Sequence, residues 1–174
     1  PSIFQGTMVR PKTPRIFNLD APRHLRGKAQ RTQLELLDAL NQKHLEEHSG
    51  ESDLQARMAS YGLAARMQSA AKEAFDISGE SKHIRTMYGV DQDATRDYGT
   101  RCLIARRLVE RGVRFVQILC NGQVWDHHGS IKTALPQRCA EIDQPAAALV
   151  KDLKQRGLLD STLVHWGGEM GRLP

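Results

Sequence analysis

The chain has 174 residues, of which 40% are hydrophobic and 26% are charged, so its composition is that of one folded domain and excludes wholesale disorder. No apolar run approaches the ~18 residues that a membrane-spanning helix needs, so we expect no membrane partner. The three cysteines form no CxxC pair, which argues against a structural zinc site and against a disulfide scaffold.

The formal net charge of +5 is concentrated near the N-terminus. Residues 1–31 carry seven basic residues against Asp20 alone, so the rest of the chain is close to neutral. Residues 1–27 also hold four prolines, which predicts an extended basic strap followed by a folded domain over residues 28–174. The strap could contact an anion or nucleic acid. It carries no nucleic-acid-reading motif, so we interpret it as a solvated strap and do not expect nucleic acid as a partner.

Periodic apolar residues predict three helices in the first two thirds of the chain. Apolar residues at three- and four-residue steps indicate a first helix that ends before residue 49. A second helix is expected to begin near Ser52, because Ser52 and Gln55 form a capping-box pattern. A third runs over about residues 94–111 and ends at Gly112, a residue that suits a left-handed helix cap.

Two short apolar segments predict buried strands. The first, VRFVQILC, covers residues 113–120, and the second, STLVHW, covers residues 161–166. A helix with Pro145 in its first turn is expected between them. Strands joined by a helix within one sheet run parallel. The expected fold class is therefore α/β, a helix-rich partial sheet of parallel strands flanked by several helices.

Polar side chains follow both predicted strands. Asp126, His127 and His128 come after the first strand, and Glu169 and Arg172 come after the second. Because parallel strands place their C-terminal ends at one edge of the sheet, where ligands bind in open α/β folds, we expect the two groups to share that edge.

These residue types suit a divalent metal ion and an anionic ligand. Asp126 and His128 are two residues apart in a loop, and Glu169 could add a third ligand. The ion could be zinc, manganese, iron or calcium. Arg172 could hold an anionic oxygen of the substrate. His127 is either a further substrate contact or a structural residue of the loop, and a hydrogen-bonded loop histidine is the alternative for His128 as well.

Four other histidines show no partner in the sequence and are interpreted as surface residues: His24, His44, His48 and His83.

Several segments, in the same order, resemble a known family. They are LIARRLVERGVRFVQ at residues 103–117, WDHH at residues 125–128 and DLKQRGLLDSTLVHWGGEMGRLP at residues 152–174. They are similar to an uncharacterised, sulfatase-like bacterial family, domain of unknown function 1501, of the alkaline-phosphatase superfamily. The resemblance covers most of the chain from about residue 5.

The resemblance implies an alkaline-phosphatase-like α/β fold and metal-dependent hydrolysis of a small anionic sulfate or phosphate ester. Glu169 takes the place of a metal-binding aspartate of the sulfatases. Met170 stands where the sulfatases carry histidine or asparagine, a departure that removes one expected ligand. The resemblance also implies an exported protein, although no export signal occurs in this chain.

The resemblance supplies no catalytic residue. Sulfatases use a nucleophile within a CxPxR-type motif, and none occurs here. We therefore expect an internal fragment that forms an incomplete sulfatase-like domain. The alternative is a non-catalytic module of the same fold with an interaction or assembly role. An incomplete sheet would expose strand edges, so a homo-oligomer is expected in either case.

Overall fold

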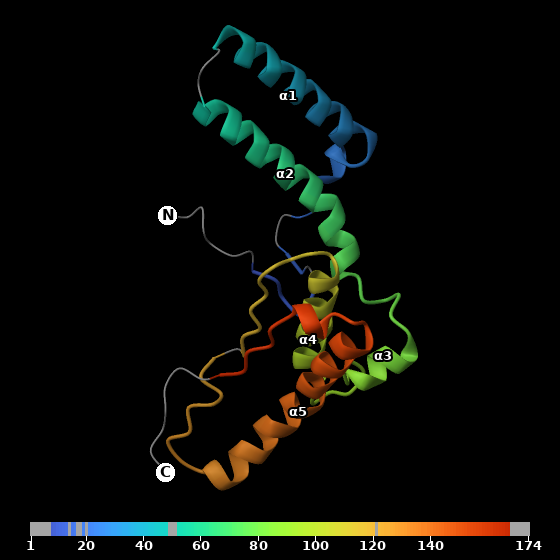
Figure 1. Cartoon of the computed structure of the whole chain (residues 1–174), viewed down its shortest axis with the longest axis vertical. Coiled ribbons are helices and arrows are strands. Elements are labelled where there is room, and N and C mark those ends of the chain that lie inside the picture. Colours follow the sequence, from blue (N-terminus) through green and yellow to red (C-terminus); the bar gives the residue numbers. More distant parts are fainter. Residues whose placement is uncertain are drawn as a thin grey trace. The chain divides into compact units, whose positions relative to one another are not determined.

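The computed structural model describes residues 8–13, 15–16, 19, 21–48, 52–120 and 122–167. Within these residues the regular elements are five α-helices and two short 3-10 helices, and there is no β-strand (Figure 1). The α-helices are α1 (Lys28–Glu47), α2 (Ser52–Phe75), α3 (Lys82–Met87), α4 (Arg96–Glu110) and α5 (Ile131–Gln155). The 3-10 helices are η2 (Arg23–Leu25) and η3 (Leu159–Ser161). No helix among the described residues is both long and apolar enough to cross a membrane.

The chain divides into two compact units, unit 1 at residues 1–75 and unit 2 at residues 76–174. In unit 1 the helices α1 and α2 lie side by side (Figure 1). The predicted first helix is confirmed, and so is the start of the second at Ser52. The leucine stripe of α1 is largely exposed, and no residue of α1 is fully buried. Unit 1 therefore gains little from a buried apolar face on α1.

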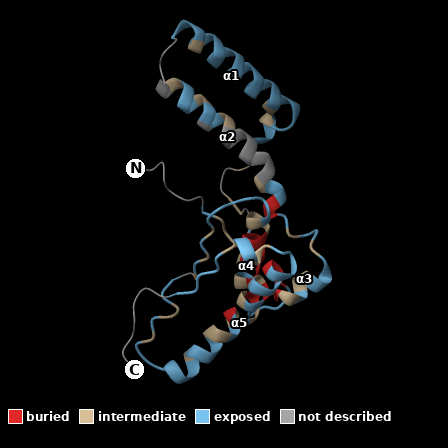
Figure 2. Ribbon diagram, viewed as in Figure 1, coloured by how far each residue is buried: buried red, intermediate tan, exposed pale blue. Residues whose placement is uncertain are grey.

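The core of unit 2 forms where α4 packs on α5. Cys102 and Leu103 of α4 meet Ala148 of α5, and Tyr88 and Val90 from the preceding turn complete the buried cluster. Buried residues gather on the same two helices in Figure 2. The predicted third helix is confirmed as α4, which is followed by a glycine with positive φ.

A glycine allows the turn before α4 to approach the helix closely. A Cβ atom on Gly99 would lie 2.1 Å from the backbone oxygen of Tyr88, far inside van der Waals contact. The hydroxyl of Thr95 donates to the backbone oxygen of Gly89 at 2.7 Å and ties the same turn together. This close approach positions Tyr88 in the core.

A buried guanidinium links three parts of unit 2. Arg106 of α4 is only 2% exposed, and its Nε lies 3.0 Å from Oδ2 of Asp152 on α5. Its Nη2 lies 2.8 Å from Oε1 of Glu80, and its Nη1 contacts Glu110. The phenol of Tyr88 donates to Oδ2 of Asp152 at 3.1 Å. Because a buried charge is costly unless it is paired, these partners hold α4, α5 and the segment before α3 in register.

The predicted α/β fold is wrong for the residues that the structure describes. Residues 113–120 and 161–166 were expected as buried strands, but apart from Ser161, which ends η3, they are irregular, and they lie largely at the surface. Phe115 is 83% exposed and Leu163 is 93% exposed. A strand is stable only when a neighbouring strand completes its hydrogen bonds. Neither segment has such a neighbour among the described residues, and the helices pack on each other instead.

Helix α5 also differs from expectation. It begins at Ile131, so Pro145 lies in its interior rather than in its first turn, and Pro136 lies inside it as well. Pro145 is fully buried, and Ile142, Ala148 and Leu153 are buried on the same helix. The packing of this apolar face outweighs the hydrogen bonds that the two prolines remove.

Candidate functional site

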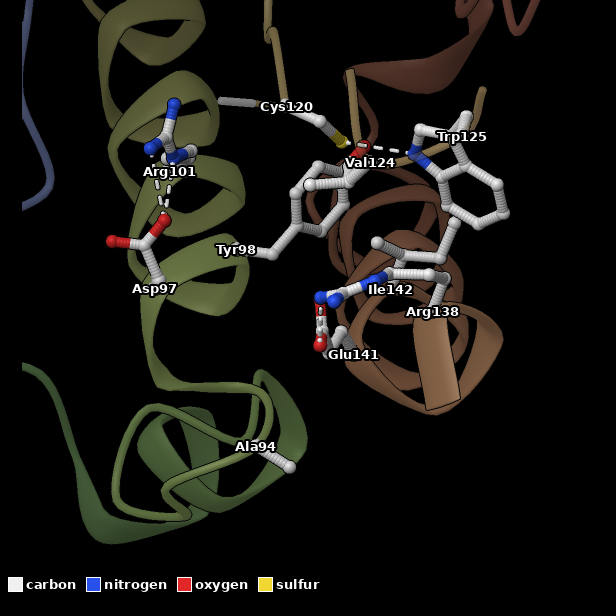
Figure 3. Close-up of a pocket in the computed structure, with 10 residues that line it drawn as sticks. All are labelled: Ala94, Asp97, Tyr98, Arg101, Cys120, Val124, Trp125, Arg138, Glu141 and Ile142. Atoms are coloured by element: carbon white, nitrogen blue, oxygen red, sulfur yellow. Dashed lines mark hydrogen bonds and ion pairs between the residues drawn. The ribbon is translucent and has the colours of Figure 1, made fainter. Parts of the chain in front are cut away.

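Unit 2 contains a pocket of about 210 Å³ between α4, α5 and the loop that joins them. Its lining residues come from three stretches of chain and are drawn in Figure 3. They are Ala94, Asp97, Tyr98, Arg101, Cys120, Val124, Trp125, Arg138, Glu141 and Ile142. Its lining combines aromatic, apolar and charged side chains.

Two arginines in the pocket wall each pair with a carboxylate of their own helix. Arg101 Nη2 lies 2.8 Å from Oδ2 of Asp97, and its Nη1 donates to the backbone oxygen of Leu119 at 2.7 Å. Arg138 Nη1 lies 2.6 Å from Oε1 of Glu141. Each pair keeps part of its surface exposed, and ion pairs of this kind are individually weak.

Tyr98 and Trp125 supply the aromatic side chains of the pocket, and Cys120 lines it beside Trp125 (Figure 3). The indole Nε1 of Trp125 lies 3.5 Å from the sulfur of Cys120. Burial raises the pKa of Tyr98 to about 12, so its phenol stays protonated at neutral pH and can donate a hydrogen bond. Burial also raises the pKa of the neighbouring Cys102 to about 12, which makes this thiol a poor nucleophile.

The residues of the predicted metal pair come shortly after two pocket-lining residues in the sequence. Val124 and Trp125 line the pocket, and the next three residues are Asp126, His127 and His128. The Nδ1 atom of His128 lies 3.5 Å from Oδ1 of Asp126, and the His128 side chain is 85% exposed. The structure thus brings together the two residues that their spacing singled out. Whether they bind a metal stays a prediction.

His127 faces the backbone instead. Its Nδ1 lies 3.1 Å from the backbone oxygen of Trp125, and the side chain is half-buried. Because a carbonyl oxygen can only accept, Nδ1 carries the proton and Nε2 is left as the acceptor. Glu169 and Arg172 lie outside the described residues, so their expected place beside Asp126 stays a prediction.

Sequence reasoning missed several residues of functional interest. Arg101 has a carboxylate four residues before it, and Arg138 has one three residues after it, so each ion pair could be predicted from helical spacing. That the two arginines share a pocket depends on how α4 packs on α5 and could not be predicted in this way. His44 and His48 are exposed, as expected, but they are not isolated from each other, because their ring centroids are 4.1 Å apart. Their four-residue spacing was the signal.

In the residues that the structure describes, the protein is helical and has a charged pocket beside an aspartate–histidine pair. A family model described as a protein of unknown function, DUF1501, matches residues 1–174. The chain therefore belongs to the DUF1501 family, which confirms the family part of the resemblance. The comparisons add no link to the sulfatases. No curated protein and no solved structure matches the sequence significantly.

Proposed function

We propose that the chain binds a divalent metal ion at Asp126 and His128 and hydrolyses a small sulfate or phosphate ester held in the adjoining pocket. The observation that carries the proposal is the contact between these two side chains in the loop that also lines the pocket. Metal ligands and substrate pocket would then share one loop, so an ester bound in the pocket would lie beside the ion.

The donor atoms fit a transition-metal ion. Two ligand atoms at about 2.1 Å from a tetrahedral ion are about 3.4 Å apart. Nδ1 of His128 and Oδ1 of Asp126 are 3.5 Å apart, so one ion could bridge them with little movement. Two protein ligands bind weakly by themselves, and we propose Glu169 as the third. The ion would act as a Lewis acid on the ester oxygen.

The pocket residues have separate roles in this proposal. Arg101 and Arg138 would exchange part of their contact with carboxylates for the anionic group of the ester, which a guanidinium binds in bidentate fashion. Tyr98 would donate a hydrogen bond through its protonated phenol. His127 would offer its Nε2 to the substrate, and Arg172 is proposed as a further anion contact. The nucleophile is not assigned.

The experiment is a turnover assay of the full chain with 4-nitrophenyl phosphate and 4-nitrophenyl sulfate, in the presence of zinc, manganese or calcium. We expect metal-dependent hydrolysis that falls about tenfold or more in Asp126→Asn and His128→Ala. Arg138→Met should raise KM more than it lowers kcat, because it removes a contact to the substrate. His165→Ala, an exposed histidine elsewhere in unit 2, is the control. Absence of turnover with every metal would contradict the proposal.

A second candidate function is a non-catalytic interaction role. It is favoured by the exposure of large apolar side chains in the two segments that were expected as strands. These side chains are Phe115, Leu119, Leu163 and Trp166. Apolar surface of this kind is common where a protein meets a partner or a second copy of itself.

A further inference from the structure

The C-terminal turn of α1 gathers three metal-ligating side chains that the proposed function does not use. They are His44, Glu47 and His48, and each offers a ligand atom within 4.8 Å of the other two. All three are exposed, so an ion from solution can reach them without displacing core residues. They belong to unit 1, whereas Asp126 and His128 belong to unit 2.

Helix geometry places these side chains together. Residues three and four apart lie on the same face of an α-helix, so His48 is one turn beyond His44, and Glu47 shares that face. The two imidazole rings are tilted by 36° with centroids 4.1 Å apart. The arrangement depends on regular helix up to Glu47, which α1 provides, and on the cap at His48, whose backbone N–H donates to the carbonyls of the last turn.

A hydrogen bond prepares His48 as a ligand. Its Nδ1 atom lies 2.9 Å from the backbone oxygen of His44. A carbonyl oxygen only accepts, so Nδ1 carries the ring proton and Nε2 keeps its lone pair for a metal ion. Histidines that bind metals in proteins usually donate the other ring N–H to a carbonyl or carboxylate in this way, and the bond fixes the orientation of the ring.

We infer that His44, Glu47 and His48 form a second divalent-metal site, specific for a borderline transition-metal ion such as zinc, nickel or copper. Two imidazoles and one carboxylate match the preferences of these ions, whereas calcium and magnesium favour oxygen ligands throughout. Three protein ligands leave at least one coordination position for water. The bound ion would link successive turns and hold the end of α1 in helical form.

The test is a zinc titration of the full chain carrying Asp126→Asn and His128→Ala, which removes the pair proposed in unit 2. We expect one equivalent of zinc to remain bound. Adding His44→Ala or His48→Ala should lower its affinity about tenfold or more, and Glu47→Gln should lower it by a smaller factor. The matched control is His83→Ala, an exposed histidine in unit 2, which should leave zinc binding unchanged.

Two outcomes would overturn the inference. One is that no equivalent of zinc remains in the protein that lacks Asp126 and His128. The other is that His44→Ala and His48→Ala bind zinc as the His83→Ala control does. Far-UV circular dichroism of each variant separates loss of ligands from loss of helix. Because the site in unit 2 is already removed, failure here does not count against the proposed hydrolase.

Discussion

Single residues in unit 2 hold the pocket helices in place. Glu80 shows how, because its buried carboxylate contacts both Arg106 and Arg107. Burial by itself would raise the pKa of Glu80, but the hydrogen bonds and charges of these arginines outweigh burial and lower it. The ionised form of Glu80 is therefore favoured more in the folded chain than in the unfolded chain.

This pKa shift predicts an acid-sensitive contribution to stability. When folding lowers the pKa of a carboxylate, the ionised group stabilises the folded chain. This contribution is complete at pH values above the pKa in the unfolded chain, and it is lost as the pH falls through the pKa in the folded chain. Glu80→Gln should be less stable than the wild type at neutral pH, and its stability should fall less between about pH 6 and about pH 3. Urea unfolding across this range measures both effects. Glu35→Gln, at an exposed position on α1, should leave the pH profile of the wild type unchanged.

Gly99 is the second residue on which the packing depends. Alanine has the better helix propensity, by about 1 kcal/mol, but its methyl group would collide with the backbone oxygen of Tyr88. We expect Gly99→Ala to lower the free energy of unfolding by about 1–3 kcal/mol. Gly79→Ala is the matched control, because nothing lies within 4 Å of a Cβ atom at that position. Equal unfolding midpoints for the two variants in urea would contradict the account.

At the scale of elements, α5 supplies three residues of the pocket wall although it contains two prolines. Pro136 is exposed, so its side chain contributes little packing to set against the hydrogen bond that its ring nitrogen cannot donate. Pro145 is fully buried and contributes to the contact with the core. A substitution of Pro145 would therefore remove packing in the core, whereas a substitution of Pro136 would remove little packing.

We expect Pro136→Ala to stabilise the chain, by up to about 3 kcal/mol, because alanine restores a helical hydrogen bond and has the higher propensity. Pro145→Ala should stabilise the chain less than Pro136→Ala, or destabilise it, since it also leaves a small cavity in the core. Thermal unfolding followed by circular dichroism compares them. A lower unfolding temperature for Pro136→Ala than for the wild type would be inconsistent with the role assigned to α5.

The helices could be predicted from sequence because their signals are local. The apolar period, the capping box at Ser52 and the glycine after α4 all act within a few residues. The strands over residues 113–120 and 161–166 were predicted from their apolar, β-branched composition, their short length and the turn residues that follow them. β-Propensity mainly reflects how well a side chain fits a sheet that already exists, and no sheet forms among the described residues.

The candidate site likewise has one part that local sequence signals predict and one part that depends on the packing of the helices. The two-residue spacing of Asp126 and His128 is local, and the structure places these side chains in contact. The pocket beside them was not predicted, because it arises from the packing of α4 on α5. The contact between His44 and His48 at the end of α1 follows from their four-residue spacing, which is a local signal.

For the whole molecule, the exposed apolar segments predict self-association. Large apolar side chains in contact with water favour burial against a second copy, by about 25 cal/mol for each Å² removed from water. We expect the full chain to associate with rising concentration, and the double variant Phe115→Ser/Leu163→Ser to stay monomeric over the same range. Ile131→Ser, at an exposed apolar residue of α5, is the control. Sedimentation velocity measures the result, and a wild type that is monomeric at every concentration would refute it.

The central claim for the whole molecule is that unit 2 binds a divalent metal at Asp126 and His128. The most direct measurement is the zinc content of the purified full chain after dialysis against a zinc buffer at neutral pH. It is made with His44→Ala/His48→Ala, so that the site proposed on α1 does not contribute. We predict one equivalent of zinc in this protein and its loss when Asp126→Ala is added. Absence of bound zinc before that substitution, or an unchanged equivalent after it, would contradict the claim.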